Sequence, residues 1–139
     1  MMIAELQAIA SFMASQPLTV GAAVKEFGTV QEDYYANVIV KPYNPLFQEI
    51  NIVRRISRDT GKHTDFISSI DFKPVNPPTV ETLVQAFGNY KRGMPRIKLP
   101  LNIVFRLDLP DKPYKISMIV GVKNNQAVTI SMLPQKKSQ

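Results

Sequence analysis

A stretch of twelve residues occurs twice in this chain, sixty positions apart. Residues 17–28 read Pro-Leu-Thr-Val-Gly-Ala-Ala-Val-Lys-Glu-Phe-Gly, and residues 77–88 read Pro-Pro-Thr-Val-Glu-Thr-Leu-Val-Gln-Ala-Phe-Gly, with six identities and no gap. This period is too long for a solenoid repeat and favours a duplicated supersecondary unit. The duplication is therefore expected to set the architecture, although it names no reaction.

Each copy has the pattern of a short, capped helix. Thr19 and Thr79 stand where an N-cap residue is needed, and apolar residues follow at helical spacing as far as Gly28 and Gly88. The glycines are expected to end these helices in a left-handed conformation. The apolar stripe over 3–15 predicts one further helix ahead of the first copy.

After each short helix, the spacing of apolar residues changes to the alternation of β-strands. Three strands separated by turn residues are predicted in each half. Their ranges are 35–41, 49–57 and 63–72, then 102–109, 114–122 and 127–133. Because consecutive hairpins pair antiparallel, the sequence predicts an α+β fold with one or two antiparallel sheets and helices packed on one face.

The chain length fits a single domain over residues 1–139. Within it we expect pseudo-repeats of the form helix-strand-strand-strand over 17–74 and 77–134, and a frayed polar tail at 135–139. The linker 73–78 is short and rich in proline, so the halves are not expected to move freely.

Composition excludes several kinds of catalytic site. The chain has no cysteine and a single histidine, His63, which rules out thiolate chemistry and leaves no set of histidine metal ligands. It contains neither a glycine-rich phosphate loop nor a nucleophile elbow. We therefore expect a protein that is not an enzyme and binds no cofactor or metal.

The sequence also predicts a location. No stretch approaches the roughly 20 apolar residues that a membrane-spanning helix needs. The apolar start of the chain lacks the basic region of a secretory signal peptide and contains Glu5. We expect a cytoplasmic protein with no membrane contact.

Charge is unevenly divided along the chain. Residues 1–76 hold 7 basic and 8 acidic side chains, whereas residues 77–139 hold 10 basic and 3 acidic ones. A one-sided positive field attracts an acidic protein surface or nucleic acid. The alternative interpretation is that the excess positive charge only keeps the protein soluble and includes a basic C-terminal tail.

The segment 89–98 packs four cations and one tyrosine into ten residues. Cations beside an aromatic ring are typical of loops that bind single-stranded nucleic acid, and they also suit an acidic protein surface. Arg106, Lys115 and Lys123 extend this patch across the predicted sheet. The candidate binding residues, for protein or for nucleic acid, are Tyr90, Lys91, Arg92, Arg96, Lys98, Arg106 and Lys115.

Some apolar residues occupy strand positions that should point away from the core. Their apolar character suggests that a partner or a second copy of the chain covers part of that face. Aromatic residues near loops of the first half are candidate interface anchors as well. The candidate interface residues are Val104, Ile119, Leu133, Tyr43 and Phe47.

Two adjacent arginines, Arg54 and Arg55, fall inside a predicted strand, so alternation turns one of them toward the apolar face. A bulge that changes the register is one explanation, and an arginine paired with a carboxylate at the core margin is another. The interpretation we favour is an edge-strand pair that discourages aggregation.

The helix pattern Thr-x-x-x-x-Val-x-x-Phe-Gly, at 19–28 and 79–88, followed by three strands resembles the unit of the outer-membrane-assembly small lipoproteins of the SmpA/OmlA type. Its tandem form is similar to the β-lactamase-inhibitor-protein fold. The resemblance implies a tandem unit that binds other proteins with its sheet or loops. It transfers no functional residue.

The function we predict is a non-enzymatic protein-binding module, such as an inhibitor, immunity-type protein or adaptor, which contacts an acidic protein surface. A homodimer formed through the apolar outward residues is a candidate assembly. The alternative is a nucleic-acid-binding accessory protein that uses the 89–98 loop. A third class is a small-ligand carrier or enzyme with a pocket between helix and sheet.

Overall fold

The computed structural model describes residues 2–92 and 101–137 of the chain. The helices of this part are α1 (Met2–Ala14), α2 (Val20–Phe27) and α3 (Val80–Phe87). The strands are β1 (Gly28–Asp33), β2 (Asn37–Pro42), β3 (Phe47–Ile56), β4 (His63–Pro74), β5 (Lys91–Arg92), β6 (Leu101–Leu107), β7 (Tyr114–Lys123) and β8 (Gln126–Lys136).

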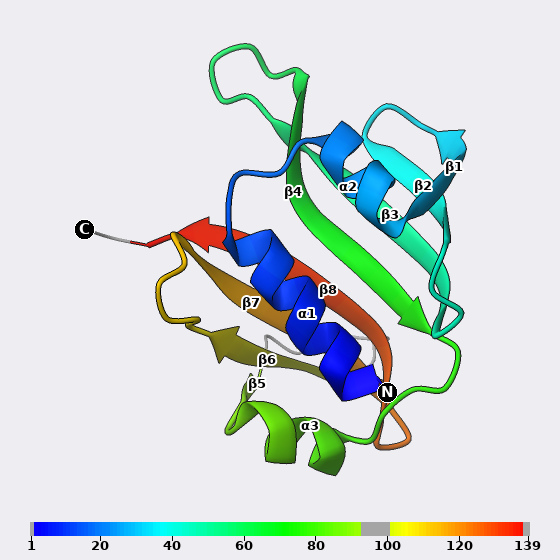
Figure 1. The fold of residues 1–139 in the computed structure, drawn as a ribbon, viewed down its shortest axis with the longest axis vertical. Helices are drawn as coiled ribbons and strands as arrows, with labels where there is room; N and C mark the ends of the chain where they lie inside the picture. Colours follow the sequence, from blue (N-terminus) through cyan, green and yellow to red (C-terminus); the bar gives the residue numbers. More distant parts are fainter. Residues whose placement is uncertain (1, 93–100, 138–139) are drawn as a thin grey trace.

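All eight strands belong to one antiparallel sheet with the order β1-β2-β3-β4-β8-β7-β6-β5 (Figure 1). Neighbours along the chain pair as hairpins within each half. The halves meet where β4 pairs with β8, through the partners Ile70 and Met132, Asp71 and Ser131, and Phe72 and Ile130. The α+β class and the antiparallel sheet are therefore confirmed, and the sheet is continuous.

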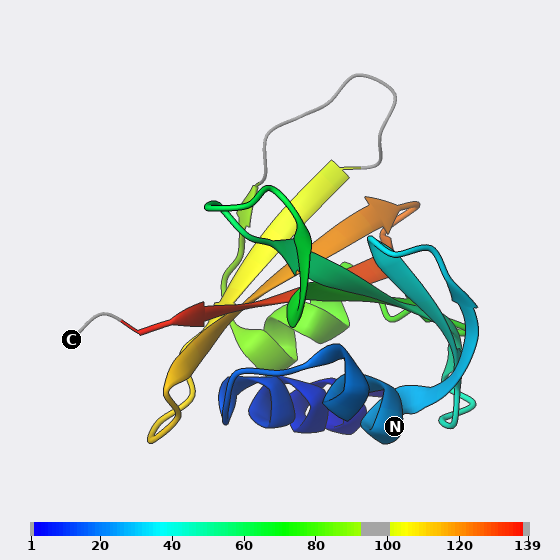
Figure 2. The same cartoon turned by 90° about the horizontal axis from the view of Figure 1, so that it is seen from above.

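The core lies between α1, α2 and one face of the sheet. Figure 2 shows α1 and α2 below the sheet, with α1 running beneath its middle. α1 contacts β7 and β8, and α2 contacts β1 to β4. Because α3 has only one fully buried side chain, Leu83, the packing of all three helices on one face stays a prediction, as does the duplication of the two halves.

The predicted caps and turns are present. Thr19 Oγ1 accepts a hydrogen bond of 3.1 Å from the backbone N–H of Ala22, and Thr79 Oγ1 accepts one of 3.3 Å from that of Thr82. The β7–β8 hairpin turns at Asn124 and Asn125, whose φ angles of 52° and 61° suit a two-residue turn. These features depend on residues close together in the chain, which is why the sequence pattern could predict them.

The prediction of three strands in each half was wrong, because each half has four. β1 follows α2 without a loop, and five of its six residues are exposed, so it shows no alternation of apolar and polar residues. β5 contains only two residues. The tail prediction was also wrong at its start: β8 runs to Lys136 because Gln135 pairs with Lys115 and Lys136 pairs with Tyr114.

Gly28 does not end α2 in a left-handed conformation, contrary to the prediction. Its φ of 169° is extended backbone, and it is the first residue of β1. A Cβ atom at Gly28 would lie 2.0 Å from the carbonyl oxygen of Lys41 and 2.5 Å from Val40 Cγ1. The position requires glycine because β2 approaches closely, whereas Gly88 has the expected positive φ of 86°.

Candidate binding face of the sheet

The face of the sheet opposite α1 and α2 is called here the open face. Outward residues alternate with buried ones along much of the inner strands; in β8, for example, Ser131 lies between the buried Ile130 and Met132. The outward residues of β1 to β4 are Thr29, Glu32, Asn37, Ile39, Lys41, Glu49, Asn51, Val53, Ser69, Asp71 and Lys73. Those of β5 to β8 are Lys91, Asn102, Val104, Arg106, Lys115, Ser117, Ile119, Gly121, Lys123, Thr129, Ser131, Leu133 and Gln135.

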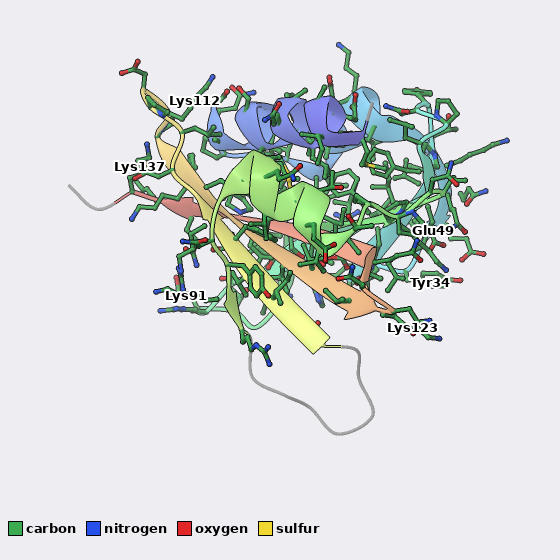
Figure 3. All side chains as sticks on the ribbon, turned by 90° about the horizontal axis from the view of Figure 1, so that it is seen from below. Tyr34, Glu49, Lys91, Lys112, Lys123 and Lys137 are labelled. Atoms are coloured by element: carbon green, nitrogen blue, oxygen red, sulfur yellow. The ribbon has the colours of Figure 1, made fainter. Side chains whose placement is uncertain are left out.

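Charge is segregated on the open face. In its β5–β8 part, the described outward residues include four cations and no carboxylate; these cations are Lys91, Arg106, Lys115 and Lys123. In the β1–β4 part, three carboxylates are mixed with two lysines. Lys91 lies on the edge strand β5 and Lys123 at the end of β7, and Figure 3 shows them well apart, so the cations are spread over the β5–β8 part. We call the β5–β8 part of the open face the basic half.

Three predicted interface residues meet within this basic half. Val104 of β6 pairs directly with Ile119 of β7, and Leu133 of β8 lies opposite Ser117, the outward residue two positions from Ile119. All three side chains are half-buried. Register therefore gathers them into one apolar patch with cations on its margins.

The basic half also contains a hollow of about 220 Å³, which we call the Arg106 hollow. Arg106 pairs with Ser117 across β6 and β7, and Lys115 pairs with Gln135 across β7 and β8. Ser117 and Lys115 are two residues apart on β7 and share its outward side. The remaining lining residues are Leu107, Asp108 and Ile116. Register thus brings together two residues that were predicted as binding residues separately.

One carboxylate, Asp108, borders the Arg106 hollow. Its Oδ1 lies 2.8 Å from Lys137 Nζ, and Lys137 also donates a hydrogen bond of 2.7 Å to the carbonyl oxygen of Leu109. The hydrogen bond from Lys137 and its positive charge lower the pKa of the Asp108 carboxyl below its usual value. The charge of Lys115 lowers this pKa as well, so Asp108 is ionised, is paired with Lys137 and also feels the charge of Lys115.

Other predicted binding residues do not join this face. The ring of Tyr90 packs against Phe105 of the core, with centroids 5.7 Å apart, so it is not a free stacking platform. Arg92 is an edge residue opposite Ile103, which points to the core side. Arg96 and Lys98 lie outside the described residues.

The two aromatic candidates of the first half behave differently. Phe47 is buried and packs against Phe72 at 5.2 Å between ring centroids, so its assignment to an interface was wrong. A register shift between Phe47 and Glu49 turns Phe47 inward, to the same side as Ile50 and Ile52. Tyr43 is exposed, as predicted, but it borders a cavity with residues of α1 and α2 and is therefore remote from the open face.

For Arg54, both alternatives to the edge-strand interpretation apply: the register shifts at this residue, and its guanidinium pairs with carboxylates. β3 lies between β2 and β4, so the edge-strand interpretation was wrong. The register of β3 with β4 shifts at Arg54, and its guanidinium bridges Asp33 at 3.3 Å and Asp65 at 3.4 Å. Strict alternation along 63–72 would place Phe66 on the same inward side as Ile70 and Phe72, but the same shift leaves its ring exposed.

Sequence reasoning missed a polar cluster at the centre of the open face. Asp71 pairs with Asn51 on one side and Ser131 on the other. Burial raises the pKa of the Asp71 carboxyl, and hydrogen bonds from Ser131 and Asn51 partly oppose that rise. No sequence signal marks this cluster, because the β4–β8 pairing that creates it joins residues sixty positions apart.

Within residues 2–92 and 101–137, no three histidine or acidic side chains gather in a way that would hold a metal ion. No helix of this part of the chain has the length and apolar character needed to cross a membrane. No protein-family model, curated protein or solved structure significantly matches the chain. The resemblance to tandem protein-binding units therefore stays a prediction.

Proposed function

We propose that this protein is a non-enzymatic binding module whose open face docks an acidic surface of a partner protein. The observation that carries the proposal is the segregation of charge on the basic half, where four outward cations of the strands surround an apolar patch and the one bordering carboxylate, Asp108, is paired with Lys137. Apolar contact supplies affinity, and complementary charge steers the encounter and fixes orientation.

The cations of the basic half are held on strands, not on a loop. Each side chain leaves a backbone that is paired on at least one side, so the array of charges is already arranged before binding. A preorganised surface loses less conformational entropy on association than a flexible one. This favours specific docking over diffuse attraction.

The aromatic residues favour a protein partner over single-stranded nucleic acid. Base stacking needs an accessible ring beside the cations. None of the described outward residues of the open face is aromatic, and Tyr90 is committed to Phe105. We therefore place nucleic acid second.

We also propose that the two halves descend from one duplicated unit. Both halves consist of an eight-residue helix followed by four strands, and both helices begin after a threonine cap. The equivalent order in the sheet supports this origin. On this view, the basic half is one copy whose outer face acquired a binding role.

The test compares charge reversals that differ only in position. The variant Lys91→Glu/Lys123→Glu changes two cations of the basic half, whereas Lys25→Glu/Lys62→Glu changes two exposed cations on α2 and in the β3–β4 turn. Immobilised proteins would capture partners from a lysate of the source organism. We expect a defined protein that binds the wild type and the control, and is lost with the first variant.

Equal capture by both variants would remove the basic half as the docking surface. Fluorescence anisotropy with labelled oligonucleotides at low and near-physiological salt serves as the second arm. Tight binding that weakens steeply with salt and is lost with Lys91→Glu/Lys123→Glu would instead support the nucleic-acid function.

A further inference from the structure

We propose that the Arg106 hollow binds a phosphate monoester dianion carried by a phosphorylated side chain of the partner. This inference rests on the proposed function for the source of the phosphate, but the site itself is argued from the hollow alone. The phosphoryl group would be the part of the partner that anchors it to the basic half.

The donors of the hollow come from three adjacent strands. Directly paired residues of an antiparallel sheet have Cβ atoms about 5 Å apart, and residues two apart on one strand are separated by about 7 Å. Arg106 and Ser117 form one such pair, and Lys115 and Gln135 form the other. The long arginine and lysine side chains can therefore reach one anion seated above Ser117.

The chemistry of these four side chains matches a phosphoryl group. The guanidinium of Arg106 offers a planar fork to two oxygens, and the ammonium of Lys115 supplies a second charge. The hydroxyl of Ser117 and the amide of Gln135 add neutral donors. Two cations balance a dianion, whereas a carboxylate or a phosphodiester carries only one negative charge.

The two cations are available for such a ligand. Among residues 2–92 and 101–137, the ion pairs are those of Arg54 and Lys137, and neither Arg106 nor Lys115 forms one. The nearby carboxylate, Asp108, is already held by Lys137. An anion entering the hollow therefore meets two cations that form no ion pair, while the charge of Asp108 also acts on Lys115 and restricts where the anion can lie.

Ser117 gives the hollow a polar floor. It is only 8% exposed and is the only polar residue in the buried class within the described part of the chain. The next outward residue on β7, Ile119, is apolar. An apolar side chain therefore fits the outward side of this strand, and the hydroxyl of Ser117 is not required by packing alone. The volume of about 220 Å³ is several times the roughly 30 Å³ that one water occupies in the liquid, which leaves room for a phosphoryl group.

The experiment follows backbone amide shifts by two-dimensional NMR while inorganic phosphate is added, and then a phosphoserine peptide and its unphosphorylated form. We expect shifts centred on 105–108, 115–117 and 135 with phosphate and with the phosphopeptide. Arg106→Gln/Lys115→Gln should weaken binding at least about tenfold, which corresponds to about 1.4 kcal/mol. Lys25→Gln/Lys62→Gln removes the same charge from exposed positions outside the basic half and should retain binding.

An equal loss in both variants, or no localised shift with phosphate, would overturn the site. Tighter binding of an oligonucleotide than of the phosphopeptide at the same residues would overturn the monoester assignment. If phosphate fails to bind while Lys91→Glu/Lys123→Glu still abolishes partner capture, only this inference fails. If phosphate binds and partner capture is insensitive to the reversal, the site stands and the proposed function fails.

Discussion

The two halves of this molecule share an order of elements but differ in what their surfaces present. Within the described residues, every large hydrophobic side chain that is exposed belongs to the first half, from Val30 to Val75. The second half instead presents unpaired cations around a half-buried apolar patch. The first half also ties its central arginine, Arg54, to Asp33 and Asp65, whereas Arg106 has no such partner.

In this fold, the order of helices and strands therefore does not determine which residues the outer surface presents. The inward residues of each strand must be apolar to bury the core, and both halves obey that requirement. The outward residues carry no such constraint. Each half can therefore specialise its outer face without loss of the shared sheet.

The helix-ending glycines provide the strongest test of this comparison. Gly28→Ala should destabilise the protein by about 3 kcal/mol, because the new Cβ would overlap the backbone of Lys41 and separate β1 from β2. Gly88→Ala should cost about 1–2 kcal/mol, because nothing lies near the new methyl group and only the backbone conformation is strained. Urea unfolding measures both, and equal losses would contradict the distinct reasons given for the two glycines.

The next largest effect on the free energy of unfolding is expected at Arg54, with the neighbouring Arg55 as the control. Arg54→Met should lower the free energy of unfolding by about 1–2 kcal/mol, since it removes a largely buried cation and leaves Asp33 and Asp65 without their shared partner. Its exposed neighbour supplies the control, and Arg55→Met should change stability by less than about 0.5 kcal/mol. A neutral Arg54→Met variant would show that the bridge adds no stability.

The helix caps should behave alike in the two halves. Thr19→Ala and Thr79→Ala each remove one acceptor for a helix N–H and should each cost about 1 kcal/mol by urea unfolding. Thr→Ser at either position keeps the acceptor and should recover most of that loss. A large difference between the two alanine variants would argue that tertiary contacts outweigh capping at one of them.

Two aspartates should give the smallest effects, with opposite signs. The pKa of Asp71 is raised by burial, so its contribution to stability falls as pH rises through the range between its unfolded and folded values. Asp71→Asn should therefore stabilise the protein slightly at neutral pH. The pKa of Asp108 is lowered by Lys137, so its contribution is present at neutral pH and is lost on acidification. Asp108→Asn should be slightly destabilising at neutral pH.

Chemical denaturation near pH 7 and at about pH 3, below the ordinary aspartate pKa, checks these signs. Both differences from the wild type should shrink at the lower pH, where the carboxyls are largely protonated. A destabilising Asp71→Asn at neutral pH would show that its hydrogen bonds with Asn51 and Ser131 outweigh its burial.

Local patterns predicted a large part of the fold. The capping threonines, the positive-φ asparagines of the β7–β8 turn and the alternation along β6 to β8 depend on neighbouring residues, so the sequence contains them in full. β1 and β5 escaped prediction because edge strands that are exposed or very short have little alternation to detect. Arg54 and Phe66 were misplaced because a register shift reverses the parity on which the prediction rests.

The candidate site was predictable only in its parts. Charge counting identified Arg106 and Lys115 as basic, and strand alternation identified Val104, Ile119 and Leu133 as outward. Their assembly depends on which residues face each other across β6, β7 and β8, and a sequence pattern does not specify that register. Tyr90 is the opposite case. Its ring is suited to stacking on a ligand, but it packs against Phe105 of the core and is therefore not a free stacking surface.

The sequence by itself determined the α+β class, the antiparallel hairpins, the helix starts and the excess of positive charge in the second half. These follow from short-range sterics, hydrogen bonding and composition, which act within a few residues. Only the tertiary structure decided that β4 pairs with β8 in one continuous sheet, that Gly28 is required by close approach, and that Arg106, Lys115, Ser117 and Gln135 meet. Such contacts join residues distant in the chain, and they become fixed only when the core between helices and sheet closes.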